Sequence, residues 1–167
     1  IRGIRVKYNP FKGVYLKGLA GVQRLFWEPY MDGNRGIVRA FDAEWNLNES
    51  FAGMADNKTR FMLGASFVSK YEDTQKSENV AYGDSMIVKY DYVLPANVAA
   101  AAGRVSIFRG GFNFYTEYVY KFNNPSAFND YIYKTGDALL VRATYSTKGF
   151  GLVLALKRID NMSYKSK

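Results

Sequence analysis

The feature that most constrains this chain is a set of long runs in which apolar and polar side chains alternate. The clearest is GGFNFYTEYVYKFNNP, residues 110–125. In this run Phe112, Phe114 and Tyr118 share one parity, whereas Glu117 and Lys121 share the other. Side chains on a β-strand point alternately to its two faces, so the run predicts a strand with one aromatic face and one charged face.

Eight runs of this kind can be marked along the sequence. Most span about ten to thirteen residues, which is longer than the five or six usual in soluble sheets. A strand tilted by about 45° crosses a bilayer with roughly ten residues, so the lengths favour membrane-spanning strands. The runs lie at residues 3–9, 13–25, 36–48, 59–71, 97–108, 111–122, 137–146 and 149–159.

The connections between the runs alternate in length. Tight turns are predicted at residues 9–12, 109–110 and 146–148, and an intermediate connection with one helical turn at 49–58. Long loops are predicted at 26–36, 72–96 and 123–136, with a hairpin arm at 86–94 inside the longest. Outer-membrane barrels have short turns on one side of the membrane and long loops on the other. The sequence therefore predicts an all-β protein, an antiparallel up-and-down transmembrane β-barrel of about eight strands.

The two faces of the runs differ in character. One is apolar over its whole length, and the other mixes charged, glycine and small apolar residues, which suits a lumen better than bulk water. Aromatic residues gather towards both ends of the runs, as they do at membrane interfaces. A soluble β-barrel or sandwich that binds an apolar or carbohydrate ligand in an aromatic interior is the alternative interpretation.

Cysteine and histidine are both absent from the 167 residues. Their absence excludes thiol nucleophiles, zinc–thiolate sites, Ser-His-Asp triads and imidazole bases. Asp42 and Glu44 share a face at a spacing that glycosidases use, but acidic pairs are also common inside barrels. We therefore predict that the protein is not an enzyme, with no catalytic residue, no cofactor and no metal site.

The charge balance is basic, with a formal net charge of +8. The cations are dispersed and form no nucleic-acid-binding signature, so no nucleic-acid partner is predicted. On the inward parity, cations outnumber anions; this pattern predicts either an anion-selective pore lining or a charge network that fills a closed lumen. The predicted lumen-lining residues are Arg5, Lys7, Lys17, Asp42, Glu44, Arg104, Glu117, Lys121, Arg142 and Lys157.

Two arginines break this pattern. Arg39 and Arg158 have the parity of the lipid-facing residues, where a guanidinium at mid-bilayer is costly. The loop assignment places both near the extracellular rim, where arginine can reach lipid phosphates. We therefore predict that both contact outer-membrane lipid.

Four segments carry a resemblance to a known family: GIVRAFDAEWNLNESF, NKTRFMLGASFVSKYE, GGFNFYTEYVYKFNNP and KGFGLVLALKRIDNMSY. Together they resemble an uncharacterised family of porin-like outer-membrane β-barrel proteins from Bacteroidetes-type Gram-negative bacteria. The resemblance implies an outer-membrane location and a barrel architecture, and it carries over no site residues. It also implies longer proteins, so residues 1–167 are expected to form a single β-barrel domain or an internal portion of a larger barrel. The expected function is that of a pore, a scaffold or an accessory component of an envelope complex, with other envelope proteins as partners.

Overall fold

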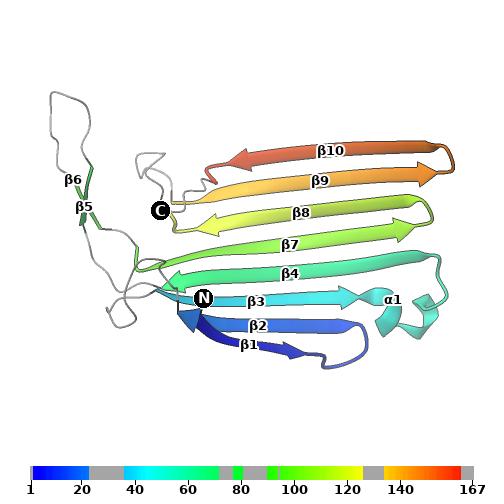
Figure 1. The fold of residues 1–167 in the computed structure, drawn as a ribbon, viewed down its shortest axis with the longest axis horizontal. Helices are drawn as coiled ribbons and strands as arrows, with labels where there is room; N and C mark the ends of the chain where they lie inside the picture. Colours follow the sequence, from blue (N-terminus) through cyan, green and yellow to red (C-terminus); the bar gives the residue numbers. More distant parts are fainter. Residues whose placement is uncertain are drawn as a thin grey trace.

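The main element of the protein is one eight-stranded antiparallel sheet, seen in a computed structural model that describes residues 2–22, 36–71, 77–80, 90–93, 95–125 and 134–162. The strand order is β1-β2-β3-β4-β7-β8-β9-β10, so the chain runs up and down across the sheet (Figure 1). The predictions of an all-β fold and of an antiparallel up-and-down strand arrangement are confirmed.

All eight predicted runs are strands, and most boundaries agree within one or two residues. The prediction was wrong for Leu47 and Asn48, which begin the short helix α1 (Leu47–Ser50) instead of ending the third strand. Residues 23–25 of the second predicted run lie outside the described residues. The strands of the sheet are β1 (Arg2–Tyr8), β2 (Val14–Val22), β3 (Ile37–Asn46), β4 (Thr59–Tyr71), β7 (Asn97–Arg109), β8 (Phe112–Phe122), β9 (Gly136–Thr147) and β10 (Phe150–Asp160).

Short and long connections lie at opposite ends of the sheet, as predicted. We call the end with connections 9–13, 47–58, 110–111 and 148–149 the turn end, and the opposite end the loop end (Figure 1). The predicted hairpin arm in the longest loop is β6 (Tyr90–Val93), which pairs with β5 (Ser77–Val80) in a separate two-stranded sheet. The rest of its predicted range lies outside the described residues.

The intermediate connection at the turn end is built around Asn48. Its Nδ2 donates hydrogen bonds to the carbonyl oxygens of Met54 and Thr59 at 2.9 and 2.8 Å, and its Oδ1 accepts one from the Phe61 N–H at 2.8 Å. A single helical turn is not stable in isolation. These bonds hold α1 and the 3₁₀ helix η1 (Ala52–Met54) against the start of β4.

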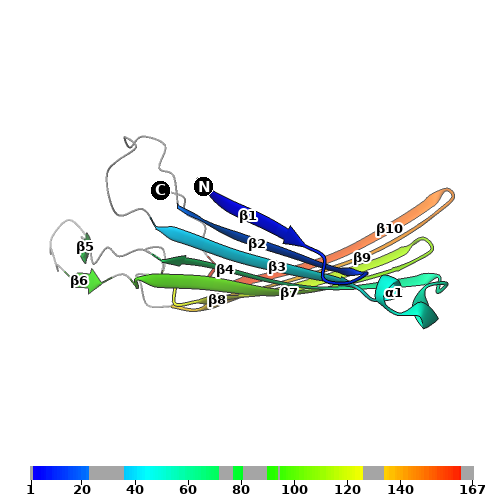
Figure 2. The ribbon, with the colours of Figure 1, turned by 90° about the horizontal axis from the view of Figure 1, so that it is seen from below.

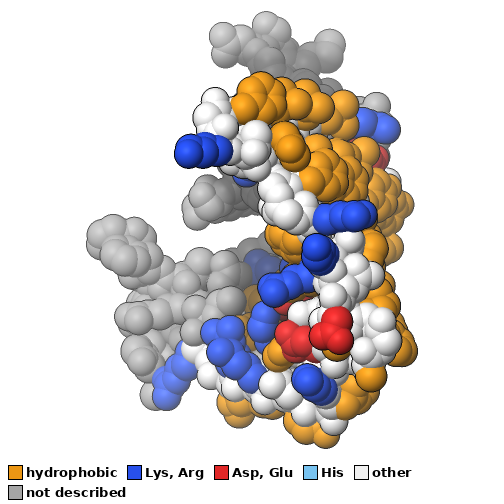
Figure 3. Space-filling model, turned by 90° about the vertical axis from the view of Figure 1, so that its right-hand side faces the viewer, with side chains coloured by type: hydrophobic (Ala, Val, Ile, Leu, Met, Phe, Trp, Pro, Cys, Tyr) orange, Lys and Arg blue, Asp and Glu red, His pale blue; other side chains and the backbone are white. Residues whose placement is uncertain are grey.

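The sheet is curved into an open trough. Figure 2 shows β1 and β10 rising on the same side of the central strands, and the view along the strands in Figure 3 has a C-shaped outline. In the described part of the chain, β1 pairs with β2 alone and β10 with β9 alone, so the sheet is not closed. In this part of the chain, β1 and β10 are edge strands. The backbone N–H and C=O groups on the outer edge of each have no partner strand among the described residues.

The described residues form no hydrophobic layer beneath or above the sheet. Among the described residues no large hydrophobic side chain is buried. Many large hydrophobic side chains of the convex side are exposed, for example Ile4 at 73% and Leu154 at 61%. A domain of this length normally buries a sizeable core. The described residues therefore leave the apolar surface of this sheet uncovered.

Candidate functional site

The cross-strand register places all ten predicted lumen-lining residues on one face of the sheet. Residues directly opposite each other in a ladder share a face. Lys7 is opposite Lys17, Lys17 is opposite Asp42, and Arg104 is opposite Glu117. We call this side the charged face. It comprises Arg5, Lys7, Lys17, Asp42, Glu44, Arg104, Glu117, Lys121, Arg142 and Lys157, together with the other residues of the same parity.

The charged face is the concave one. A groove of about 350 Å³ lies on this face, bordered by Arg5, Lys17, Asp42 and Glu117. In Figure 3 the Lys, Arg, Asp and Glu side chains cluster towards the hollow of the C, and hydrophobic side chains cover its outer surface. We call the opposite, convex side the apolar face.

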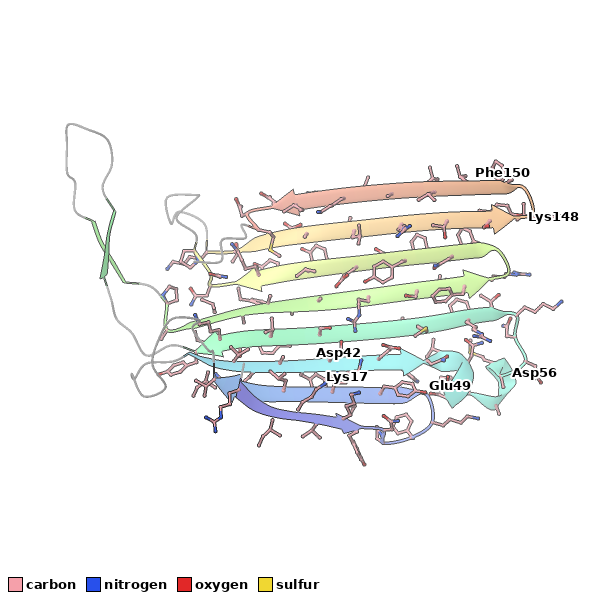
Figure 4. All side chains as sticks on the ribbon, in the orientation of Figure 1. Lys17, Asp42, Glu49, Asp56, Lys148 and Phe150 are labelled. Carbon is pink, nitrogen blue, oxygen red and sulfur yellow. The ribbon has the colours of Figure 1, made fainter. Side chains whose placement is uncertain are left out.

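Asp42 is the centre of the charge network. Its Oδ2 accepts a hydrogen bond from Lys17 Nζ at 3.1 Å, and its Oδ1 accepts bonds from Arg104 Nη2 at 2.5 Å and Ser66 Oγ at 2.7 Å. Lys17 and Asp42 lie side by side on β2 and β3 (Figure 4). One carboxylate on β3 thus accepts from two cations and a hydroxyl group on three other strands. This arrangement is an ion-pair network that ties β2, β3, β4 and β7 together.

A second contact extends the network across β8. The Tyr115 hydroxyl donates to Glu117 Oε2 at 2.6 Å, and Glu117 is opposite Arg104 in the register. Sequence reasoning missed both Ser66 and Tyr115 as members of this site. The sequence signal that could have identified them is their parity, which places both on the charged face, Ser66 on β4 and Tyr115 on β8.

Several cations of the charged face have no counter-ion in the described part of the chain. In the described ranges no carboxylate lies within ion-pair distance of Arg5, Lys7, Arg142 or Lys157. Glu44 likewise has no ion-pair partner there. Lys121 is buried and donates to the carbonyl oxygen of Asn161 at 2.5 Å. The structure thus joins three of the ten residues into one ion-pair network and leaves most of the other cations uncompensated.

The turn end carries a separate set of hydrogen bonds. The Tyr15 hydroxyl and Asn46 Nδ2 donate to the two carboxylate oxygens of Glu49 at 2.7 and 2.8 Å. Trp45 Nε1 donates to Ser50 Oγ at 2.8 Å. Figure 4 shows Glu49 and Asp56 in the connection 47–58 at the turn end, away from Asp42. The contacts anchor α1 on β2 and β3.

The apolar face has aromatic residues towards both ends and also in its middle. Phe41 and Phe67, directly opposite each other in the middle, are 47% and 44% exposed. Phe26, Trp27 and Tyr30, aromatic residues of the predicted long loop at 26–36, lie outside the described residues. The exposed aromatics are Tyr8, Trp45, Phe112, Tyr145 and Phe150 towards the turn end, and Tyr71, Tyr118 and Phe122 towards the loop end.

Arg39 and Arg158 lie on the apolar face near the loop end. Arg39 is opposite Ala20 and Ser69, and Arg158 is opposite Leu139. The Arg158 side chain is 65% exposed, with Nη2 3.9 Å from carboxylate oxygens of both Asp137 and Asp160. Arg39 has no ion pair within the described segments. The two arginines therefore differ in electrostatic environment although they share a face.

Other kinds of site find no support in the described part of the chain. No group of three or more His, Cys, Asp or Glu side chains is arranged to hold a metal ion. Among the same residues, no helix is long and apolar enough to span a membrane. Asp42, one of the two carboxylates at glycosidase-like spacing, is held by three donors in the charge network.

Comparison with known proteins identifies a family but no function. A family model described as a family of unknown function, DUF6029, matches residues 1–167. Searches of curated proteins and of solved structures gave no match. The match spans the whole sheet, its connections and the Asp42 network. The chain belongs to the DUF6029 family, whose function is unknown.

Proposed function

We propose that this chain forms the wall of a transmembrane β-barrel in the outer membrane of a Gram-negative bacterium. The apolar face contacts lipid, and the charged face lines the lumen. The barrel acts as a pore, a scaffold or an accessory component of an envelope complex, and it carries out no catalysis. One observation carries this proposal: no large hydrophobic side chain is buried in the described part of the chain, and the convex face is covered with exposed ones.

Exposed apolar surface on this scale needs a nonaqueous partner. Monomeric soluble proteins rarely expose continuous apolar patches larger than a few hundred Å². The strands β4, β7 and β9 have 13, 13 and 12 residues, enough to cross a bilayer at a barrel-like tilt. Exposed aromatic residues towards both ends of the apolar face are also found in the interfacial girdles of membrane barrels.

The alternative, a soluble β-barrel or sandwich with an aromatic interior, requires the opposite curvature. Closing the sheet in the direction in which it already bends encloses Lys17, Asp42 and Arg104. It leaves Phe41 and Phe67 on the outside. The curvature therefore favours the membrane barrel.

The two edges also bear on the proposal. Backbone groups without hydrogen-bond partners are very costly in a bilayer, so spanning sheets are closed. We expect the edges of β1 and β10 to be joined in the membrane, either to each other or through further strands. Both arrangements keep the charged face inside.

The behaviour of the purified protein without detergent tests the proposal against its alternative. We expect the protein to be monodisperse in detergent micelles and to aggregate when the detergent is removed. A chain that stays monodisperse and folded in plain buffer would instead support the soluble barrel or sandwich. Size-exclusion chromatography with light scattering distinguishes the two results.

A pore lined by the charged face should prefer anions. Arg142 lies on this face with no counter-ion among the described residues, whereas Arg104 is neutralised by Asp42. We expect that Arg142→Glu will weaken the anion preference of any open channel more than Arg104→Glu, because Arg142 contributes an uncompensated charge. The measurement is the reversal potential of the protein in planar bilayers under a salt gradient. Cation-selective currents from the unmodified protein would contradict the anion-selective lining, and the absence of conductance would favour a closed lumen filled by the charge network.

Arg39 should contribute more than Arg158 to the binding of anionic lipid at the outer rim. The guanidinium of Arg158 has two carboxylates at 3.9 Å that compete with a lipid phosphate, and Arg39 has no such neighbours in the described structure. We therefore expect Arg39→Gln to reduce the lipid A retained in native mass spectrometry, and Arg158→Gln to reduce it less. Equal retention by both variants and the unmodified protein would leave only nonspecific snorkelling to the headgroups.

A further inference from the structure

A row of apolar side chains crosses the charged face in the loop-end half of the sheet. Leu19, Ala40, Val68 and Ala100 lie opposite one another on β2, β3, β4 and β7. Together with Ala102 and Val119 they supply the apolar side chains of the charged face that line the groove of about 350 Å³, which Arg5, Lys17, Asp42 and Glu117 also border. Adjacent strands are about 4.8 Å apart, so the row is roughly 14 Å long. Three of its four members are alanine or valine, and these short side chains leave room above the sheet.

Uncompensated positive charge lies at one end of this row. Arg5 is opposite Leu19, and next to it Lys7 is directly opposite Lys17. Like charges in directly opposed positions destabilise a sheet. Of these cations, Lys17 pairs with Asp42, a carboxylate that it shares with Arg104. Arg5 and Lys7 have no ion-pair partner among the residues that the structure describes.

The other end of the row is electrostatically different. Lys121 is opposite Ala100, but it is buried and already donates to the carbonyl oxygen of Asn161. The row therefore has one free cationic end, at β1 and β2. A ligand with an anionic head and an apolar tail fits it in one direction only.

We propose that the charged face binds a single-chain anionic amphiphile, a long-chain carboxylate. Its hydrocarbon chain lies along the row from Leu19 to Ala100, and its carboxylate binds Arg5 with Lys7 and Lys17 nearby. The apolar groove supplies burial of the chain, and the cations fix its direction. Binding would also relieve the repulsion between Lys7 and Lys17. This inference uses the concave face alone and goes beyond the proposed membrane role of the convex face.

Photolabelling tests this site. The probe is dodecanoate with a diazirine in its chain, added to the protein in zwitterionic lipid nanodiscs, and the adducts are mapped by mass spectrometry. We expect adducts on the row from Leu19 to Ala100 that excess unlabelled dodecanoate suppresses. Loss of one charge-assisted contact should lower this labelling about fivefold in Arg5→Gln. Labelling by the methyl ester of the probe should not respond to Arg5→Gln.

Matched variants separate the carboxylate contact from general effects on folding. Lys157→Gln removes another unpaired cation of the charged face, on β10, and should leave the labelling of the row unchanged. Ala100→Trp fills the groove and should lower labelling by both the acid and its ester. Equal labelling of the row in Arg5→Gln and in the unmodified protein would overturn the assignment of the carboxylate.

Adducts confined to apolar-face residues outside the groove, such as Leu63 and Leu154, without competition, would show partition into the bilayer and would overturn the site. If the protein proves stable without detergent, the same labelling is carried out in buffer. The labelling of the charged face in buffer then still tests the long-chain carboxylate site, independently of the membrane proposal.

Discussion

Leu154→Arg is expected to destabilise the protein in a bilayer by about 2–4 kcal/mol, the range for a cation on the lipid side near the midplane. Leu154 lies in the middle of β10 on the apolar face and is 61% exposed. Its partner across the ladder is Ala143, so the arginine would have no carboxylate opposite it. The measurement is the free energy of unfolding in urea with the protein folded into phospholipid vesicles.

Val153→Arg is the matched control, because Val153 is the neighbouring residue on the charged face and is equally exposed, at 59%. An arginine on the lumen side stays hydrated, so we expect a cost below about 1 kcal/mol. A larger loss for Val153→Arg than for Leu154→Arg would contradict the assignment of the apolar face to lipid.

Asp42→Asn is expected to cost about 1–3 kcal/mol of stability. The substitution keeps the shape of the side chain but leaves Lys17 and Arg104 without their shared counter-ion. Removing one partner of a fully buried ion pair costs about 3–5 kcal/mol, and a surface pair is worth about 0–1 kcal/mol. The Asp42 side chain is 26% exposed, so an intermediate value is expected. The same urea titration measures it.

Glu44→Gln is the control for Asp42→Asn, since Glu44 lies two residues further along β3 on the same face and has no ion pair in the described structure. We expect a change below about 0.5 kcal/mol. Similar losses of stability in the two variants would mean that the ion pairs around Asp42 do not stabilise the protein. Both losses would then come only from removing one negative charge from the charged face.

Much of the fold follows from alternation and turn chemistry. The strand parity that separates Glu117 from Tyr118 was readable, and so was the tight turn at Gly110, which has a positive φ value. The last tight turn was predicted at 146–148 and lies at 148–149, ending one residue later. The parity also placed all ten charged-face residues on one side. These features depend on neighbours in sequence and on a strict period of two, so the sequence predicts them well.

Other features depend on contacts between distant residues. The direction in which the sheet bends decides whether Phe41 lies inside or outside, and alternation alone carries no information on it. The helix α1 forms where strand-like parity continues through Leu47 and Asn48, because Asn48 finds partners at Met54, Thr59 and Phe61. The sequence also did not predict that Asp42 binds both Lys17 and Arg104, or that Arg158 lies near Asp137.

The central claim is that the convex apolar face meets lipid, and fluorophores on single cysteines test it most directly. The chain contains no cysteine, so each introduced thiol is the sole labelling site. Neighbouring positions on a central and an edge strand form two matched pairs, Phe67→Cys with Val68→Cys and Leu154→Cys with Val153→Cys. In vesicles that contain a nitroxide-labelled lipid, we predict strong quenching at positions 67 and 154 and weak quenching at 68 and 153. Quenching that is stronger at 68 and 153 would contradict the claim.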